Sequence, residues 1–249
     1  MIRAAILVFI SAVAFGQNKV ATVQVENNVA FASVDRPGDL YVVLDNGEVL
    51  KFDKNGKQLG KRKFKSVPNI FDPRDGTRAF AYFRDSQTIE TIRPDLSDSE
   101  SSPLHPEFAI SALLVCPSKN EFWILDSADL TLKKTKERGT AIAYEAAFGR
   151  PASYMREYLN FLFILDNNEI QVLNNLGKQI SKVVINASYF SFLGEELYYP
   201  SGSSLELFDL YTNEKRQISL PHQAQFAFLT DDRMILVDQK RIEFFEFTP

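Results

Sequence analysis

The strongest constraint on the fold is a hairpin-like stretch that recurs along the chain. In its first copy, from Asp39 to Lys57, the apolar run Leu40 to Leu44 precedes Asp45-Asn46-Gly47, and a second apolar segment, Val49 to Phe52, precedes Asn55-Gly56. β-Branched and aromatic residues favour strands, and the Asp-Asn-Gly turn supplies residues that tolerate the positive φ of a two-residue hairpin loop. The stretch therefore predicts two short antiparallel strands joined by a tight turn.

Copies of this stretch are spaced almost evenly. The turn aspartates Asp45, Asp85, Asp126 and Asp166 are separated by 40, 41 and 40 residues, and the turns at Ser201 and Asp238 follow after 35 and 37 residues. A period near 40 residues with two clear strands per unit is typical of a β-propeller blade, whereas horseshoe and helical solenoids have other periods or patterns. The spacing therefore predicts an all-β fold, a single β-propeller of about six four-stranded blades.

The two ends of the chain fit a closed ring. The last repeat shows only three strands before the sequence stops at Pro249, and an isolated strand, Val20 to Val25, precedes the first repeat. This N-terminal strand is predicted to complete the sixth blade and close the ring, which hides an otherwise open sheet edge.

Within a blade, the inner strands are predicted to be continuously apolar and the outer strands mixed. Tyr41 to Leu44 and Phe161 to Leu165 show the first pattern, and Gln179 to Val184 shows the second. The alanine-rich segment Thr140 to Phe148 is the one moderate helix candidate, but the period places it on an outer strand or loop.

The first sixteen residues have the pattern of a signal peptide. Met1-Ile2-Arg3 forms a positive start, Ala4 to Val13 is apolar but too short to span a bilayer, and small residues flank Phe15. Cleavage is predicted before Gln17, with cleavage after Ala14 or a retained anchor as alternatives. Residues 1–16 are thus predicted to be a signal peptide and 17–249 the propeller domain of an exported, periplasmic or extracellular protein without a membrane span.

Composition narrows the class of protein. Hydrophobic residues make up 45% and charged residues 24% of the chain, as in globular proteins. A net charge of −4 argues against a nucleic-acid partner, which requires a clustered basic face. Cys116 is the single cysteine, so no internal disulfide forms; it follows an apolar run and is predicted to be buried in a strand, with a reactive thiol as the alternative.

Two charged segments have structural explanations. One is basic and contains Lys57, Lys61, Arg62, Lys63 and Lys65; the other is an acidic loop, Asp95 to Pro106, with Asp95, Asp98 and Glu100. The basic segment is interpreted as an exposed edge strand protected by charge, with a patch for an anionic partner as the alternative. The acidic segment is interpreted as a solvated loop because it lacks the spacing and the glycine of an EF-hand.

The repeated form, an apolar strand, Asp-Asn-Gly and then the segment Glu48 to Lys57, resembles the NHL, lactonase-like and quinoprotein-like β-propellers as a broad superfamily. The resemblance covers the mature chain and describes blade geometry rather than chemistry. The WD40 signature is missing, because Trp123 is followed by Ile124 and no Gly-His pair occurs. The export signal and short ring look similar to envelope propellers of bacteria.

The sequence assigns no catalytic, cofactor-binding or metal-binding residue. The turn aspartates are explained by capping of their own turns. Lactonase-type propellers bind a metal in the central channel, and Glu121, Asp126 and Asn160 have suitable side chains, but their spacing does not single them out. His105 and His222 each adjoin a proline, which disfavours a zinc site or a serine–histidine arrangement. The sequon at Asn186 is a glycosylation site only in a host that glycosylates.

Three functions remain. The first is a non-catalytic propeller that binds another protein of the cell envelope, such as an outer-membrane or secretion component. The second is a small-ligand or glycan-binding module at the channel mouth, which requires exposed aromatic residues; Tyr154, Tyr189 and Tyr199 are candidates. The third is a metal-dependent lactonase-like hydrolase, which requires converging carboxylates at the channel. The first is favoured, no cofactor is expected, and the oligomeric state is left open.

Overall fold

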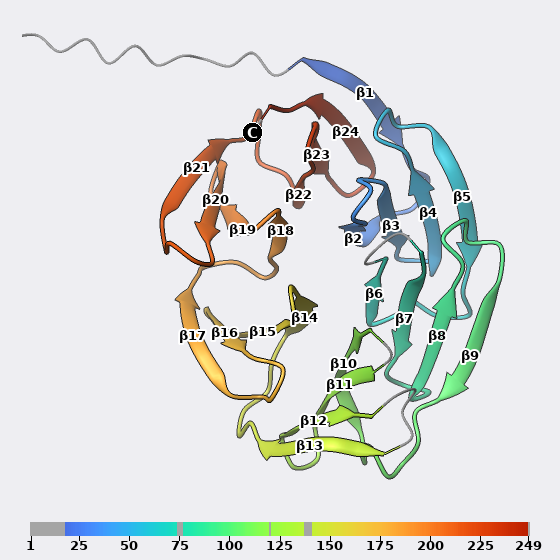
Figure 1. The fold of residues 1–249 in the computed structure, drawn as a ribbon. Coiled ribbons are helices and arrows are strands. Elements are labelled where there is room, and N and C mark those ends of the chain that lie inside the picture. Colours follow the sequence, from blue (N-terminus) through green and yellow to red (C-terminus); the bar gives the residue numbers. More distant parts are fainter. Residues whose placement is uncertain (1–17, 74–76, 120, 137–140, 249) are drawn as a thin grey trace, which may run out of the picture.

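The computed structural model describes residues 18–73, 77–119, 121–136 and 141–248. In these residues the regular elements are 24 β-strands, which form six four-stranded antiparallel sheets arranged in a ring (Figure 1). The described chain contains no helix of the length and apolarity needed to cross a membrane. The predicted fold, a six-bladed β-propeller, is confirmed. The predicted signal peptide, residues 1–16, lies outside the described residues.

The blades follow the chain in order. Blade 1 contains β2 (Val29–Val34), β3 (Leu40–Leu44), β4 (Glu48–Phe52) and β5 (Gln58–Lys63). Blade 2 contains β6 (Ile70–Asp72), β7 (Ala79–Phe83), β8 (Thr88–Ile92) and β9 (Ser99–Pro103). Blade 3 contains β10 (Ala112–Ser118), β11 (Glu121–Asp126), β12 (Thr131–Thr135) and β13 (Ile142–Ala147).

The second half of the ring repeats this arrangement. Blade 4 contains β14 (Tyr154–Tyr158), β15 (Phe161–Asp166), β16 (Glu169–Leu173) and β17 (Gln179–Val184). Blade 5 contains β18 (Ser191–Leu193), β19 (Glu196–Ser201), β20 (Ser204–Asp209) and β21 (Lys215–Ser219). Blade 6 contains β22 (Phe226–Leu229), β23 (Arg233–Val237), β24 (Arg241–Glu246) and, from the other end of the chain, β1 (Lys19–Gln24).

The ring closes as predicted. β1 pairs antiparallel with β24, with Thr22 opposite Glu243 and Val23 opposite Ile242. The blade therefore combines the first and last strands of the domain, and β24 has no open edge.

The first hairpin turn differs in one detail from the prediction. Gly47 has a φ of +83° and donates its N–H to the Leu44 carbonyl at 2.8 Å, so the loop between β3 and β4 has three residues rather than two. Asn46 accepts the Glu48 N–H at 2.8 Å and fixes the turn. Only Gly47 takes the left-handed conformation, which suits a three-residue loop that ends in a glycine.

The continuously apolar strands are the second strands from the axis, not the innermost ones. Every residue of β3 is buried, whereas the innermost strand β14 alternates between buried and half-buried residues. The second strand lies between two strands of its own sheet and between two neighbouring blades. The innermost strand has one side at the channel. The predicted continuously apolar pattern therefore belongs to the second strand of a blade rather than to the innermost one.

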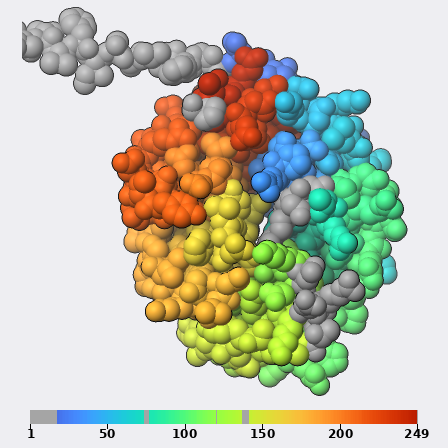
Figure 2. All heavy atoms as spheres, viewed as in Figure 1, coloured from blue at the N-terminus to red at the C-terminus, as the bar shows by residue number. Residues whose placement is uncertain are grey.

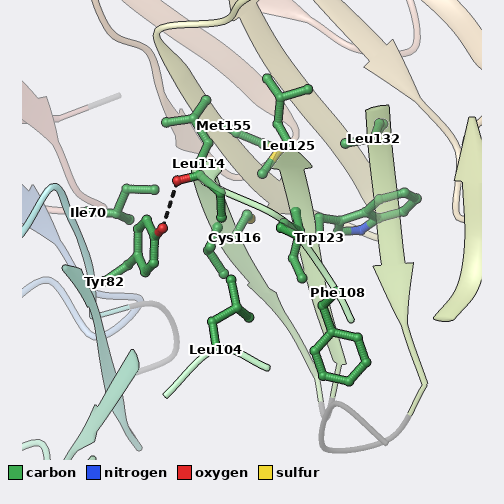
Figure 3. Close-up of a cluster of buried hydrophobic side chains, with 14 of the residues drawn as sticks. Ile70, Tyr82, Leu104, Phe108, Leu114, Cys116, Trp123, Leu125, Leu132 and Met155 are labelled. Carbon is green, nitrogen blue, oxygen red and sulfur yellow. Dashed lines mark hydrogen bonds between the residues drawn. The ribbon is translucent and has the colours of Figure 1, made fainter. Parts of the chain in front are cut away.

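Apolar clusters fill the spaces between neighbouring blades. The cluster in Figure 3 joins blades 2, 3 and 4 around Trp123, which is fully buried. There Tyr82 of β7 donates its hydroxyl to the Ala112 carbonyl of β10 at 2.7 Å, the bond drawn in the figure. Blade-to-blade packing thus supplies the core.

The outer strands are mostly as predicted. The basic segment forms β5, and the alanine-rich segment forms β13 instead of a helix. The acidic segment departs from the prediction, because Ser99–Pro103 pairs with β8 as the outer strand β9. Asp95 and Asp98 stay in the turn before it, where each carboxylate accepts backbone N–H groups.

Candidate functional site

A cavity of about 810 Å³ opens at one end of the central channel. Its walls come chiefly from the ends of innermost strands and the loops that follow them, residues 34–37, 156–160, 191–194 and 229–232. Figure 2 shows a narrow hollow at the centre of the ring. The repeated connection between the first and second strands of a blade therefore builds the cavity.

A half-buried arginine links three blades at the channel. Arg156 of β14 lies 3.8 Å from the Asp72 carboxylate of β6 and donates to the Ser191 hydroxyl of β18 at 3.3 Å. Its side chain is 12% exposed. Burial lowers the pKa of Arg156, but the Asp72 carboxylate, followed by Tyr154, Tyr198 and Cys116, outweighs it and raises the pKa above its ordinary value. The guanidinium is thus a permanent cation that links blades 2, 4 and 5.

The next residue, Glu157, is also tied to a neighbouring blade. Its carboxylate accepts the indole N–H of Trp123 at 2.9 Å, and its backbone N–H donates to the Cys116 sulfur at 3.1 Å. Glu157 and Cys116 are both buried, on β14 and β10. The prediction that Cys116 is a buried strand residue is confirmed.

An aromatic pair borders the cavity above these groups. Tyr158 and Phe192 stack with ring centroids 4.1 Å apart and an interplanar angle of 8°. The Tyr158 hydroxyl donates to the Gly194 carbonyl at 2.6 Å, and burial raises the pKa of Tyr158. This pair joins blades 4 and 5 and gives the cavity a flat apolar wall.

Charged residues surround the mouth. Arg36 and Lys119 are exposed, whereas Lys54 pairs with Asp232 at 2.6 Å. Asp35 is buried; it accepts the Asp39 N–H at 2.8 Å, and burial raises the pKa of its carboxyl. The rim therefore carries both signs of charge.

The three residues considered for a channel metal do not meet. Asn160 lines the cavity, but Glu121 and Asp126 stand at opposite ends of β11. Glu121 pairs with Lys134 at 2.9 Å. Asp126 accepts backbone N–H groups from Ile110, Ser111 and Ala128. Each of the two carboxylates thus has a structural partner.

Two of the turn aspartates, Asp126 and Asp166, hold the loops that lead into their own blades. Asp126 caps its turn through Ala128 but also holds the loop that enters β10, through Ile110 and Ser111. Burial raises the pKa of Asp126, but these three donors outweigh it and lower the pKa below its usual value. Asp166 pairs with Arg150 at 2.5 Å in the same way. These carboxylates fix the connections between blades.

The histidines have different surroundings. His105 is exposed, with Glu107 3.8 Å away. His222 lies with Asp238 and Glu243 in the one group of three potential metal ligands found among the described residues. Lys19 and Arg241 also contact Glu243, at 2.5 Å and 3.6 Å, so cations already neutralise the group. Sequence spacing gave no signal for this group, because its members come from three separate segments of blade 6 that only the folded blade brings together.

The tyrosines considered for ligand binding are parts of the core. Tyr154 packs edge-on against Phe190, and Tyr199 is 2% exposed. The Tyr189 hydroxyl accepts the Ala227 N–H at 2.6 Å. They do not form the exposed aromatic mouth that a ligand-binding module requires; Tyr158 and Phe192 border the cavity instead. A signal for Tyr158 was its position at the start of the fourth repeat copy, where the innermost strand ends.

Comparison with known proteins shows the fold. No family model and no curated protein matches the sequence. The Neurospora crassa Pan2 WD40 domain is similar in structure, with a TM-score of 0.63, 8% identity, and coverage of 94% of this chain and 98% of that one. BBS1N in complex with ARL6DN has a TM-score of 0.56 at 6% identity, over 92% and 96% of the two chains. Chaetomium thermophilum Raptor has a TM-score of 0.58 at 9% identity, over 93% of this chain and 29% of Raptor.

Identities this low establish architecture alone. The ring of sheets, the closing strand β1 and the similarity to a WD40 domain agree. The chain folds as a six-bladed β-propeller.

Proposed function

We propose that the protein is a non-catalytic interaction scaffold, exported to the periplasm or cell surface, that binds another protein of the cell envelope. An outer-membrane or secretion component is the expected class of partner. The observation that carries the proposal is the pairing of the buried polar groups in the channel. Arg156 faces Asp72 and Ser191, and Glu157 accepts the Trp123 indole, so these groups hold blades together.

Two further observations support this function. Sequence residues 1–16 have the pattern of a signal peptide. One of the similar structures, BBS1N, was solved in complex with ARL6DN. Propellers also host enzymes, so the fold carries no weight by itself.

The test is capture of the partner. Tagged protein is expressed in the source organism, the envelope is cross-linked, and the captured proteins are identified by mass spectrometry. One dominant partner at stoichiometric yield is the expected result. Recovery of the tagged protein alone, at the same yield as a tagged unrelated exported protein, contradicts the scaffold function.

Export has its own test. Mass spectrometry of the protein isolated from the envelope fraction is expected to find Gln17 as the first residue, or Phe15 if cleavage follows Ala14. A protein that retains Met1 and stays in the cytoplasmic fraction contradicts export. This result is independent of whether a partner is captured.

A small ligand or glycan at the channel mouth is a second candidate. The cavity, its flat wall of Tyr158 and Phe192, and the half-buried cation Arg156 favour it. A thermal-shift screen of glycans and small carboxylates is expected to find a ligand that stabilises the protein. Leu159→Trp, at an exposed position of the mouth, would weaken that shift; no stabilising ligand in the screen contradicts this candidate. The hydrolase alternative has no supporting observation in the described cavity.

A further inference from the structure

The outer strands of the six blades differ in how well they are protected against pairing. Edge strands are usually protected by charged residues, proline or short length. β5 has Lys61, Arg62 and Lys63, β21 begins with Lys215-Arg216, and β9 is polar and ends in Pro103. These edges carry the usual protection.

β17 is the least protected edge among these six strands. Two of its large apolar side chains are exposed, Ile180 by 51% and Val184 by 73%. β5 and β1 each have one such residue, Leu59 and Val20, and β9, β13 and β21 have none. The strand lies on the rim of the ring in Figure 1.

The backbone of β17 also has outward-facing hydrogen-bonding groups. The Ile185 N–H donates to the Asn168 carbonyl at 2.8 Å, so alternate residues before it, Val183 and Ser181, face β16. Lys182 and Val184 therefore direct their N–H and C=O groups away from the blade. The side chain of Val183 packs inward, toward blade 5, so those of Lys182 and Val184 share the opposite, exposed face.

The single charge on this edge lies between its two apolar residues. Lys182 pairs with Glu169 at 2.9 Å, but its side chain is still 45% exposed. Glu169 has a second cation, Arg150, at 3.4 Å. Lys182 can therefore turn toward an added acidic group while Glu169 keeps a partner.

We propose that β17 binds an extended segment of the partner protein as a fifth strand of blade 4. The segment has an acidic residue opposite Lys182, an apolar residue opposite Val184, and a second apolar residue near Ile180, where the register of β17 shifts. Main-chain hydrogen bonds to Lys182 and Val184 supply affinity, and the three side chains supply selectivity. This inference rests on the proposed scaffold function and specifies its binding surface.

A second copy of this chain fits the edge less well. Antiparallel pairing of β17 with itself that places Ile180 opposite Val184 also places Lys182 opposite Lys182. Like charges directly opposite each other destabilise a strand pair. The charge pattern therefore favours a partner segment that carries an acidic residue.

The inference is tested with a synthetic peptide. The probe is the fluorescein-labelled sequence Thr-Val-Thr-Glu-Thr-Val-Thr, which reads the same in both directions and so fits either strand orientation. Its control has lysine in place of glutamate. Fluorescence anisotropy with the purified protein is expected to show binding of the glutamate peptide. The affinity for the lysine peptide is expected to be lower by about tenfold.

Matched variants locate the site. Val184→Lys is expected to lower the affinity for the glutamate peptide by about tenfold or more. Leu59→Lys, the equivalent change on the edge of β5, is expected to leave this affinity unchanged. Lys182→Glu is expected to reverse the preference between the two peptides. All three positions are exposed, so circular dichroism and the thermal midpoint should stay as in the wild type.

Several results would overturn the inference. The first is that the glutamate peptide does not bind at concentrations up to about 5 mM. The second is that this peptide binds the wild type and Val184→Lys equally well. The third is that the wild type is a dimer and Val184→Lys is a monomer. If Val184→Lys captured the envelope partner at the wild-type yield, β17 would not be the binding surface. The proposed scaffold function would be unaffected by that result.

Discussion

Single polar residues near the axis connect neighbouring blades, and Arg156 also reaches a blade two places away. Arg156 reaches Asp72 of blade 2 and Ser191 of blade 5, and Glu157 accepts from Trp123 of blade 3. A buried polar group is costly without a partner. These contacts therefore fix the positions of the blades around the channel.

The contact between Trp123 and Glu157 is testable by substitution. Trp123→Phe removes the indole donor and part of the packing, and it leaves a buried carboxylate without that donor. We expect a loss of about 2–4 kcal/mol in the free energy of unfolding, measured by urea unfolding with circular dichroism because Trp123 is the single tryptophan. Adding Glu157→Gln should recover part of the loss. A change below about 0.5 kcal/mol would show that the contact is unimportant.

His222 predicts a dependence of stability on pH. Its ring nitrogens contact the Gln223 carbonyl at 3.0 Å and Glu243 at 2.5 Å, and the carbonyl first and Glu243 next raise the pKa of His222 above 6.5. A raised pKa stabilises the fold below the unfolded value, and this contribution disappears as the pH rises through the folded value. Asp238, Lys19 and Arg241 are the other charged groups around this site.

Urea midpoints of wild type and His222→Gln measure this effect. The wild type should exceed the variant by more at about pH 5.5 than at about pH 8.5. His105→Gln, at an exposed histidine, is the control and should change neither midpoint. A constant difference between wild type and His222→Gln at both pH values contradicts the assigned contacts.

Among the strands, the N-terminal strand β1 closes the ring. β1 pairs with β24 along its length, and Lys19 contacts Glu243 at 2.5 Å. Without β1, the strand β24, with the buried residues Ile242 and Phe244, becomes an open apolar edge.

Removal of β1 tests this role. A chain that begins at residue 25 is expected to unfold at a temperature lower by about 10 °C or more and to associate in size-exclusion chromatography. A chain that begins at residue 18 is the control. A synthetic peptide of residues 18–25, added in trans, should restore the midpoint. Unchanged stability and a monomeric elution of the shortened chain would contradict closure by β1.

The elements were largely predictable because they depend on local patterns. The spacing of Asp45, Asp85, Asp126 and Asp166 located the blades, and the missing fourth strand of the last repeat pointed to Val20–Val25. β9 was missed because its sequence, Ser-Glu-Ser-Ser-Pro, has no strand preference and pairs only because β8 offers an edge. Tertiary context decided that segment.

The site residues were less predictable. Contacts between blades give Arg156, Tyr158 and Phe192 their places at the cavity, and a repeat period does not reveal such contacts. Tyr154, Tyr189 and Tyr199 looked like loop aromatics, but they lie in or beside strands and pack into the core. Cys116 was predictable because a preceding apolar run is enough to indicate a buried strand.

In the whole molecule, polar contacts hold the blades together near the axis, and the outer strands at the rim differ in how well they are protected against pairing. The axis is held by Arg156 and Glu157, and the rim exposes Ile180 and Val184 of β17. A scaffold needs this division, because a rigid ring presents its binding edge in a constant position. In the proposed scaffold, the partner binds this edge rather than the cavity.

Hydrogen exchange of the purified protein, alone and in the complex captured from the envelope, distinguishes the two surfaces. The partner is expected to slow exchange at the outward-facing N–H groups of Lys182 and Val184, while the cavity loops 156–160 and 229–232 exchange as in the free protein. Protection of the cavity loops with no change in β17 would contradict this expectation and would assign the partner to the channel mouth.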